Sequence, residues 1–138
     1  IKKGFLAPPY YFNLLLGNIF SAQIDPIHIG MLIRELPKES FWSLGGLGDA
    51  QLIANTMAIL LNGGVRVGLE DNIYWDRERN QMASNLELVK RIHELTSTFS
   101  RKVMKPSEFR ELFNLENEEG KYGLKYRQDS ESSLQKAM

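Results

Sequence analysis

The segment that decides the fold runs from Gly64 to Asn72 and reads GVRVGLEDN. Its apolar part, Val65 to Leu69, is short, follows two glycines and precedes three polar residues. A short apolar run with turn residues and polar residues at its ends is typical of a buried β-strand. The segment therefore predicts a strand that ends in a cluster of polar side chains.

Two further apolar runs earlier in the chain have the same character. The run from Tyr11 to Leu16 ends at Gly17, and the run from Phe41 to Leu44 is followed by a glycine-rich turn. Each predicts a buried strand bounded by turn residues.

A helical pattern follows each of the three runs. The first helix should begin at the N-cap Asp25 with Pro26 at its first position, and Pro37 should stop it. A second should begin near Asp49 and end before Gly63 and Gly64, and a third should be capped by Ser84 or Asn85. The expected apolar faces are Ile29, Leu32, Ile33 and Leu36; Leu52, Ile53, Met57, Leu60 and Leu61; and Leu88, Val89, Ile92, Leu95 and Phe99. A short fourth helix should follow Pro106, with Ser107 near its N-cap, and run to Leu112 or Phe113.

This alternation of strands and amphipathic helices predicts a parallel sheet covered by helices, with the three strands as neighbours in chain order. Three parallel strands leave two open edges and cannot close on themselves, and a complete (β/α)₈ barrel needs at least about 200 residues. The predicted fold class is therefore α/β, with residues 1–115 forming the C-terminal part, about the last three βα units, of a TIM (β/α)₈ barrel. Residues 116–138 are polar and are interpreted as a C-terminal extension.

Within such a barrel, the alternation of side chains along a strand would turn Arg66, Gly68 and Glu70 toward the interior. The residues expected to face the helices are Val65, Val67 and Leu69. Charges inside a barrel need a partner or a metal, and Glu70, Asp71 and Asn72 follow the strand at the end where barrel active sites lie. The segment thus predicts a metal and acid–base site. The alternative is a purely structural Arg–Glu pair, with Asp71 and Asn72 forming a turn.

Composition excludes several classes of site. Lysine plus arginine equals aspartate plus glutamate, at 17 each, so the chain lacks the basic surface of a nucleic-acid-binding protein. Without cysteine, it cannot form disulfides or zinc–thiolate sites. No apolar run approaches the roughly 18 residues of a membrane span. We expect a cytoplasmic protein that binds neither nucleic acid nor membrane.

The octapeptide from Val65 to Asn72, followed by Tyr74 and then Ser84 and Asn85, resembles the C-terminal signature of the β-keto acid cleavage enzymes. Weaker likenesses occur in the expected order on both sides. They are Pro8-Pro9, the strand ending at Gly17, Gly46-Leu47-Gly48 with Gln51 beyond it, Gly63-Gly64, and the run from Lys105 to Arg110. The resemblance covers roughly Pro8 to Leu115.

By position, the resemblance implies that Glu70 is a ligand of a divalent metal, usually zinc. It also implies that Arg66 and Asp71 form a pair in which Asp71 is the base. The implied reaction transfers an acyl group between a β-keto acid and acetyl-CoA, yielding acetoacetate and a new acyl-CoA, in a homo-oligomer. A glutamate is a normal zinc ligand beside imidazoles, and an arginine would hold Asp71 ionised and aimed.

The chain departs from the family pattern in its histidines. The family's other metal ligands form a His-x-His pair on an early strand, whereas this chain has only His28 and His93, both in predicted helices. We therefore expect a partner, the N-terminal half of the barrel, on the same polypeptide or on another chain. Two alternatives stay open. One is a non-catalytic remnant or subunit of a barrel assembly; the other is a different metal-dependent, aldolase-like barrel.

The turn containing Gly46 and Gly48 precedes a helix N-terminus, where an anion such as a phosphate of coenzyme A could bind. The alternative is a tight turn between strand and helix with no ligand. We record both glycines as candidate cofactor-binding residues.

Overall fold

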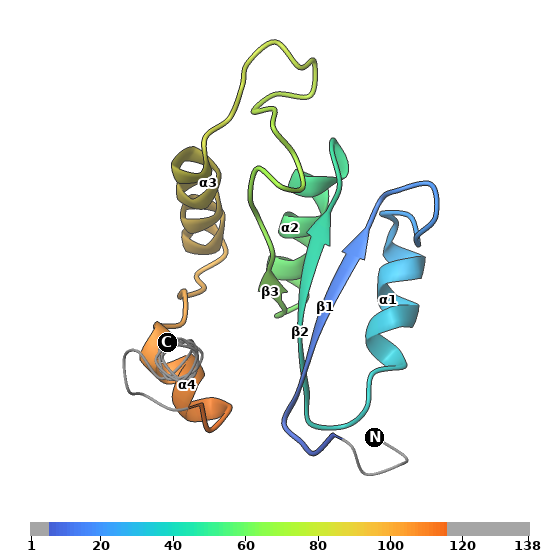
Figure 1. The fold of residues 1–138 in the computed structure, drawn as a ribbon, viewed down its shortest axis with the longest axis vertical. Helices are drawn as coiled ribbons and strands as arrows, with labels where there is room; N and C mark the ends of the chain where they lie inside the picture. Colours follow the sequence, from blue (N-terminus) through green and yellow to red (C-terminus); the bar gives the residue numbers. More distant parts are fainter. Residues whose placement is uncertain (1–5, 116–138) are drawn as a thin grey trace, which may run out of the picture. The chain divides into compact units, whose positions relative to one another are not determined.

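A three-stranded parallel sheet, in the order β1–β2–β3, forms the centre of the computed structural model, which describes residues 6–115 (Figure 1). The strands are β1 (Tyr10–Leu16), β2 (Ser40–Gly46) and β3 (Gly64–Val65). β1 and β2 pair along their whole length, whereas β3 adds only two residue pairs. The predicted parallel arrangement of these neighbours is confirmed.

The helices are α1 (Pro26–Arg34), α2 (Ala50–Leu60), α3 (Asn85–Thr98) and α4 (Pro106–Leu112). The Asp25 side chain accepts hydrogen bonds from two amides of α1, as predicted for an N-cap. Ser84 caps α3 and exchanges hydrogen bonds with Glu87 in a capping box. Asn85 is therefore the first helical residue, and its side-chain oxygen accepts a hydrogen bond from the Leu69 amide at 2.9 Å.

The chain forms two compact units, one ending at Val103 and one beginning at Met104. α4 belongs to the second unit, where Pro106 is its first residue and the Lys105 amide donates to Glu108. The N-cap is Lys105, two residues before Ser107, and the helix begins at Pro106 itself, one residue earlier than predicted. The predicted C-terminal extension, 116–138, lies outside the described residues.

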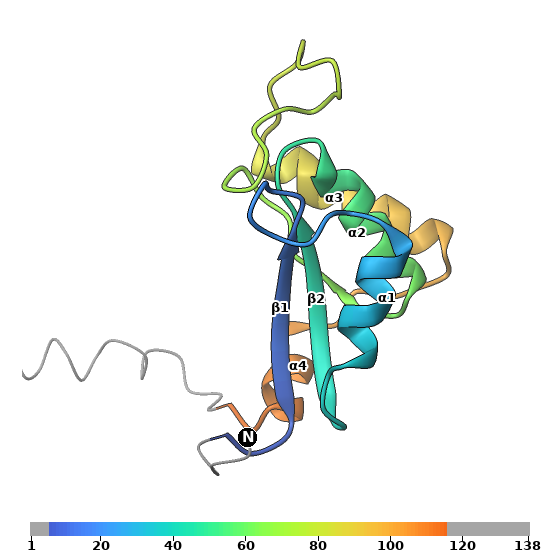
Figure 2. The same cartoon turned by 90° about the vertical axis from the view of Figure 1, so that its right-hand side faces the viewer.

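Helices α1 and α2 pack on one face of the sheet, and α3 packs against α2 (Figure 2). The buried core between sheet and helices consists of Leu16, Ile29, Leu44, Ala54 and Ala58. The opposite face is not covered by any helix of residues 6–103. The sheet of the first unit is therefore packed on one side only.

The buried face of α2 differs from the predicted one. Leu52, Ile53 and Leu60 are each more than 40% exposed, while the buried residues are Gln51, Ala54, Asn55, Ala58 and Ile59. Small residues allow α2 to approach the sheet closely, and the two amides bond to backbone groups beside the sheet. The prediction was wrong because it chose a face by hydrophobicity alone.

The third strand is also shorter than the predicted Val65–Leu69. Its last hydrogen bond to β2 runs from the Arg66 amide to the Leu44 carbonyl. Beyond it the chain turns, with the amides of Asp71 and Asn72 both donating to the Gly68 carbonyl. The apolar residues of this segment, Val65, Val67 and Leu69, are only partly buried, and beyond the Arg66 amide side-chain and turn hydrogen bonds replace the ladder.

No helix in the described part of the chain is both long and apolar enough to cross a membrane.

Candidate active site

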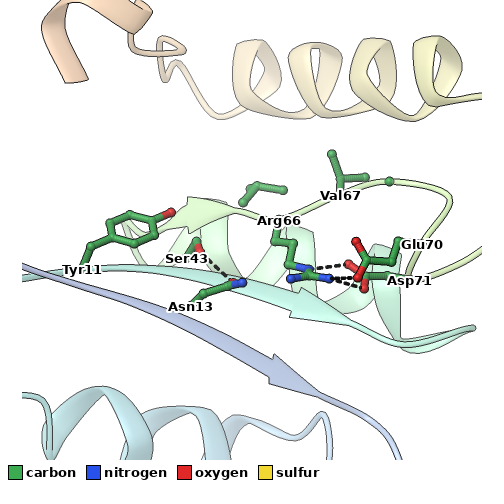
Figure 3. Close-up of a pocket in the computed structure, with 9 residues that line it drawn as sticks. Tyr11, Asn13, Ser43, Arg66, Val67, Glu70 and Asp71 are labelled. Atoms are coloured by element: carbon green, nitrogen blue, oxygen red, sulfur yellow. Dashed lines mark hydrogen bonds and ion pairs between the residues drawn. The ribbon is translucent and has the colours of Figure 1, made fainter. Parts of the chain in front are cut away.

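The helix-free face of the sheet carries polar side chains in its middle. Asn13 of β1 and Ser43 of β2 are paired in register, and the Ser43 hydroxyl donates to Asn13 Oδ1 at 3.0 Å. Tyr11 lies on the same face of β1 (Figure 3). Polar side chains on this helix-free face indicate that the face contacts a ligand or other polar groups.

Arg66 extends over this face. A Cβ on Gly45 would lie 3.2 Å from both Cβ and Cδ of Arg66. The absence of a side chain at Gly45 therefore leaves room for the arginine to cross β2.

The Arg66 guanidinium donates two hydrogen bonds to the carboxylate of Asp71, one to each oxygen. Nε lies 2.8 Å from Oδ2 and Nη2 lies 2.9 Å from Oδ1 (Figure 3). The Asp71 side chain is only 2% exposed. Two parallel charge-assisted hydrogen bonds of this kind fix both the position and the plane of the carboxylate. The structure thus brings together the two residues that the family resemblance implied to form a pair.

The pKa of Arg66 is raised above its usual value. The hydrogen bonds to Asp71 are the largest cause, followed by the charge of Asp71, and the charge of Glu70 adds to them. The guanidinium is therefore cationic wherever the protein is folded.

Glu70 is placed very differently from Asp71. Its side chain is 85% exposed, and Oε1 lies 3.1 Å from Arg66 Nη2. Arg66 Nη2 thus contacts both carboxylates. An exposed carboxylate at the rim of the site is chemically suited to bind a divalent metal.

The described residues do not supply a complete metal site. They contain no group of three histidine, cysteine, aspartate or glutamate side chains that could hold an ion. His28 contacts Asp25 on α1, and His93 is exposed on α3. Glu70 can therefore provide one ligand, and the other ligands have to come from elsewhere.

A pocket of about 340 Å³ connects these features. Its lining residues are Tyr11, Asn13, Ser43, Val65, Arg66, Val67, Gly68, Glu70 and Asp71. Val65 and Val67 were both expected to face the helices, yet both contribute to the lining beside Arg66 and Gly68, so the strict alternation expected along this segment does not hold. The sequence did not identify Tyr11, Asn13 or Ser43, because single polar residues in a strand do not reveal which face a ligand meets.

Gly46 and Gly48 form the turn between β2 and α2. A Cβ on Gly46 would lie 2.4 Å from the Ala50 carbonyl oxygen, and Gly48 has a positive φ of 56°. The Gly48 amide donates to the Asp71 carbonyl at 2.8 Å, so this turn supports the site segment directly. The close approach at Gly46 and the positive φ of Gly48 explain why both positions of this turn are glycine.

Comparison with known proteins identifies the family of this chain. The sequence profile of the β-keto acid cleavage enzymes matches residues 1–115. The chain belongs to the β-keto acid cleavage enzyme family.

Two similar relatives are 3-keto-5-aminohexanoate cleavage enzymes. The protein from Acetoanaerobium sticklandii is 36% identical, and that from Fusobacterium nucleatum is 34% identical; both alignments cover 83% of this chain. A 3-dehydrocarnitine:acetyl-CoA trimethylamine transferase of Rhizobium meliloti is 27% identical over 83% of the chain. The chain spans 41%, 41% and 37% of these relatives, respectively, so each alignment covers less than half of the relative's length.

Proposed function

We propose that this chain is the C-terminal part of a metal-dependent β-keto acid cleavage enzyme. The enzyme would transfer an acyl group between a β-keto acid and acetyl-CoA, giving acetoacetate and a new acyl-CoA. The observation that carries the proposal is the buried Asp71 held at both oxygens by Arg66, in a member of this family. The relative from Rhizobium meliloti, whose name includes acetyl-CoA, supports that co-substrate.

The complete fold in this proposal is a TIM (β/α)₈ barrel, to which residues 1–115 contribute the last three βα units. The outer edge of β1 has no partner strand in the described residues, and the helix-free face carries Asn13 and Ser43. Both features are explained if the N-terminal barrel half pairs with the open edges and encloses this face.

Asp71 is the proposed base. A carboxylate offers about four lone-pair positions, and Arg66 uses two of them. The remaining positions can accept a proton from the carbon next to the keto group of the substrate. Arg66 would then hold the carboxylate during the transfer, so that neither its position nor its plane changes.

Glu70 would hold the metal, together with ligands from the missing part of the barrel. A divalent ion such as zinc would polarise the keto oxygen and so acidify the neighbouring carbon. Because Glu70 is exposed, it can turn from Arg66 toward an ion. The Gly48 amide already donates to the Asp71 carbonyl, so a coenzyme A phosphate bound at this turn would take another donor, and Gly46 and Gly48 stay candidates for lining its site.

We also propose that the enzyme is a homo-oligomer. Helix α2 has no charged residue, and Leu52, Ile53 and Leu60 on it are about half exposed. Such a helix is normally covered by further protein, which the rest of the barrel or a neighbouring subunit would supply.

The test is turnover by the full-length protein with acetyl-CoA and a panel of β-keto acids, following acetoacetate and the new acyl-CoA. Asp71→Asn should slow turnover by roughly 100-fold or more, with little change in KM, as loss of a general base does. Glu78→Gln, which changes an exposed carboxylate outside the pocket lining, is the matched control and should be fully active. If the Asp71→Asn protein turned over as fast as the unsubstituted protein, the proposed mechanism would be refuted. Turnover of aldol substrates alone would instead favour a different aldolase-like barrel.

A further inference from the structure

The segment that carries Arg66 and Asp71 is not held by the sheet. After the Arg66 amide, it makes no further backbone hydrogen bond to β2 in the described residues. A segment outside the ladder needs other contacts if its side chains are to stay within a few tenths of an ångström of a working geometry.

Two buried amides of α2 supply such contacts. Gln51 Nε2 donates to the Gly68 carbonyl at 2.8 Å, and Asn55 Nδ2 donates to the Arg66 carbonyl at 2.8 Å. Gln51 is 2% exposed and Asn55 is 1% exposed. Asn55 Nδ2 also lies 3.4 Å from the Leu44 carbonyl, so it joins β2 to the site segment.

The positions of these amides are unusual for a helix that covers a sheet. Gln51 and Asn55 are four residues apart, and so occupy adjacent turns of the buried face, where the other residues are mainly small and apolar. A buried amide costs free energy unless it is hydrogen-bonded. Both amides donate to the segment that leaves the sheet after the Arg66 amide.

We propose that Gln51 and Asn55 are positioning residues, which set the Arg66–Asp71 pair in its catalytic geometry by holding the carbonyls of Gly68 and Arg66. The inference rests on the proposed role of Asp71 as the base. Each amide is hydrogen-bonded to a backbone carbonyl and not to the guanidinium of Arg66 or the carboxylate of Asp71, so each acts through the backbone that carries the pair.

Gln51→Met in the full-length protein is the best variant, because methionine has a similar size and lacks the donor. The Gly68 carbonyl would still accept from the amides of Asp71 and Asn72, so the variant should fold. Asn55→Leu is the second variant. Thr56→Val is the matched control, because the Thr56 hydroxyl donates to Leu52 within α2 and does not contact the site segment.

Two measurements separate positioning from mere stabilisation. The first is kcat in both the parent and the Asp71→Asn background. Gln51→Met should lower kcat about 10-fold or more at unchanged KM in the parent, and by less than about twofold in Asp71→Asn, because residues that act as a unit are not additive. The second is the NMR signal of the Arg66 Nε–H group, assigned by its loss in Arg66→Lys. This signal should shift in Gln51→Met and in Asn55→Leu, but not in Thr56→Val.

An equal loss of kcat in both backgrounds, or an unshifted Arg66 signal in a folded Gln51→Met protein, would overturn the inference. If Asp71→Asn itself were fully active, the proposed base would be wrong. The Arg66 signal would then still decide whether the amides hold the pair.

Discussion

Arg66 donates hydrogen bonds to both carboxylate oxygens of Asp71, which lies only five positions further along the chain. This contact requires the intervening residues to turn back on themselves, which they do through the hydrogen bonds to the Gly68 carbonyl. The pair is therefore a local structure whose two charged groups face each other before any other part of the barrel is added.

Replacing Arg66 with lysine should impair both function and stability. A lysine carries the charge but offers no planar fork, so it cannot hold both oxygens of a buried carboxylate. We expect Arg66→Lys to lower kcat about 10-fold or more and to lower Tm, measured by steady-state kinetics and thermal melting. Arg77→Lys is the control, because Arg77 is exposed outside the pocket lining and should tolerate the change. A fully active Arg66→Lys protein would show that two-point contact is not needed.

Glu70 and Asp71 should be separable by metal content. Glu70→Gln removes the charge of the proposed ligand, so the full-length protein should retain much less metal after dialysis. Asp71→Asn should keep its metal while losing turnover. Elemental analysis beside single-turnover rates checks both expectations. Full metal loading of Glu70→Gln would exclude Glu70 as a ligand.

The turn between β2 and α2 should be intolerant of a side chain. Gly46→Ala places a Cβ 2.4 Å from the Ala50 carbonyl oxygen, which is backbone and cannot swing away. We expect a loss of about 2 kcal/mol or more in the free energy of unfolding, from the strain of overpacking. The control is Gly30→Ala in the middle of α1, where an added Cβ meets nothing within 4 Å. That change should be neutral or stabilise by up to about 1 kcal/mol. Chemical denaturation measures both, and equal stability of Gly46→Ala would contradict the described turn.

Residues 1–138 in isolation should not behave as a stable monomer. The β1 edge and the helix-free face would expose unpaired backbone and polar side chains that the proposed barrel encloses. We expect either association or a broad, non-cooperative thermal transition, measured by sedimentation and circular dichroism. The full-length protein should melt cooperatively under the same conditions. A cooperative melt of the isolated chain as a monomer would show that it does not depend on further strands.

Local signals in the sequence were sufficient for most element boundaries. Asp25 with Pro26 located the start of α1, and the apolar run from Tyr11 located β1 to within one residue. These signals depend on neighbouring residues only, so they can be interpreted without the fold. The buried face of α2 could not be found in this way, because its small residues and amides are matched to the sheet and not to a hydrophobic pattern.

The sequence by itself determined the order of strands and helices, the parallel sheet and the family, and it singled out Arg66, Glu70 and Asp71. Tertiary structure decided which of these are buried and what holds them. Asp71 is buried and hydrogen-bonded to Arg66, while Glu70 is exposed beside the same guanidinium. Gln51 and Asn55 became part of the site only when α2 packed on the sheet. The physical reason is that side-chain periodicity and capping are properties of a local segment, whereas burial and hydrogen-bond partners depend on residues that meet only in three dimensions.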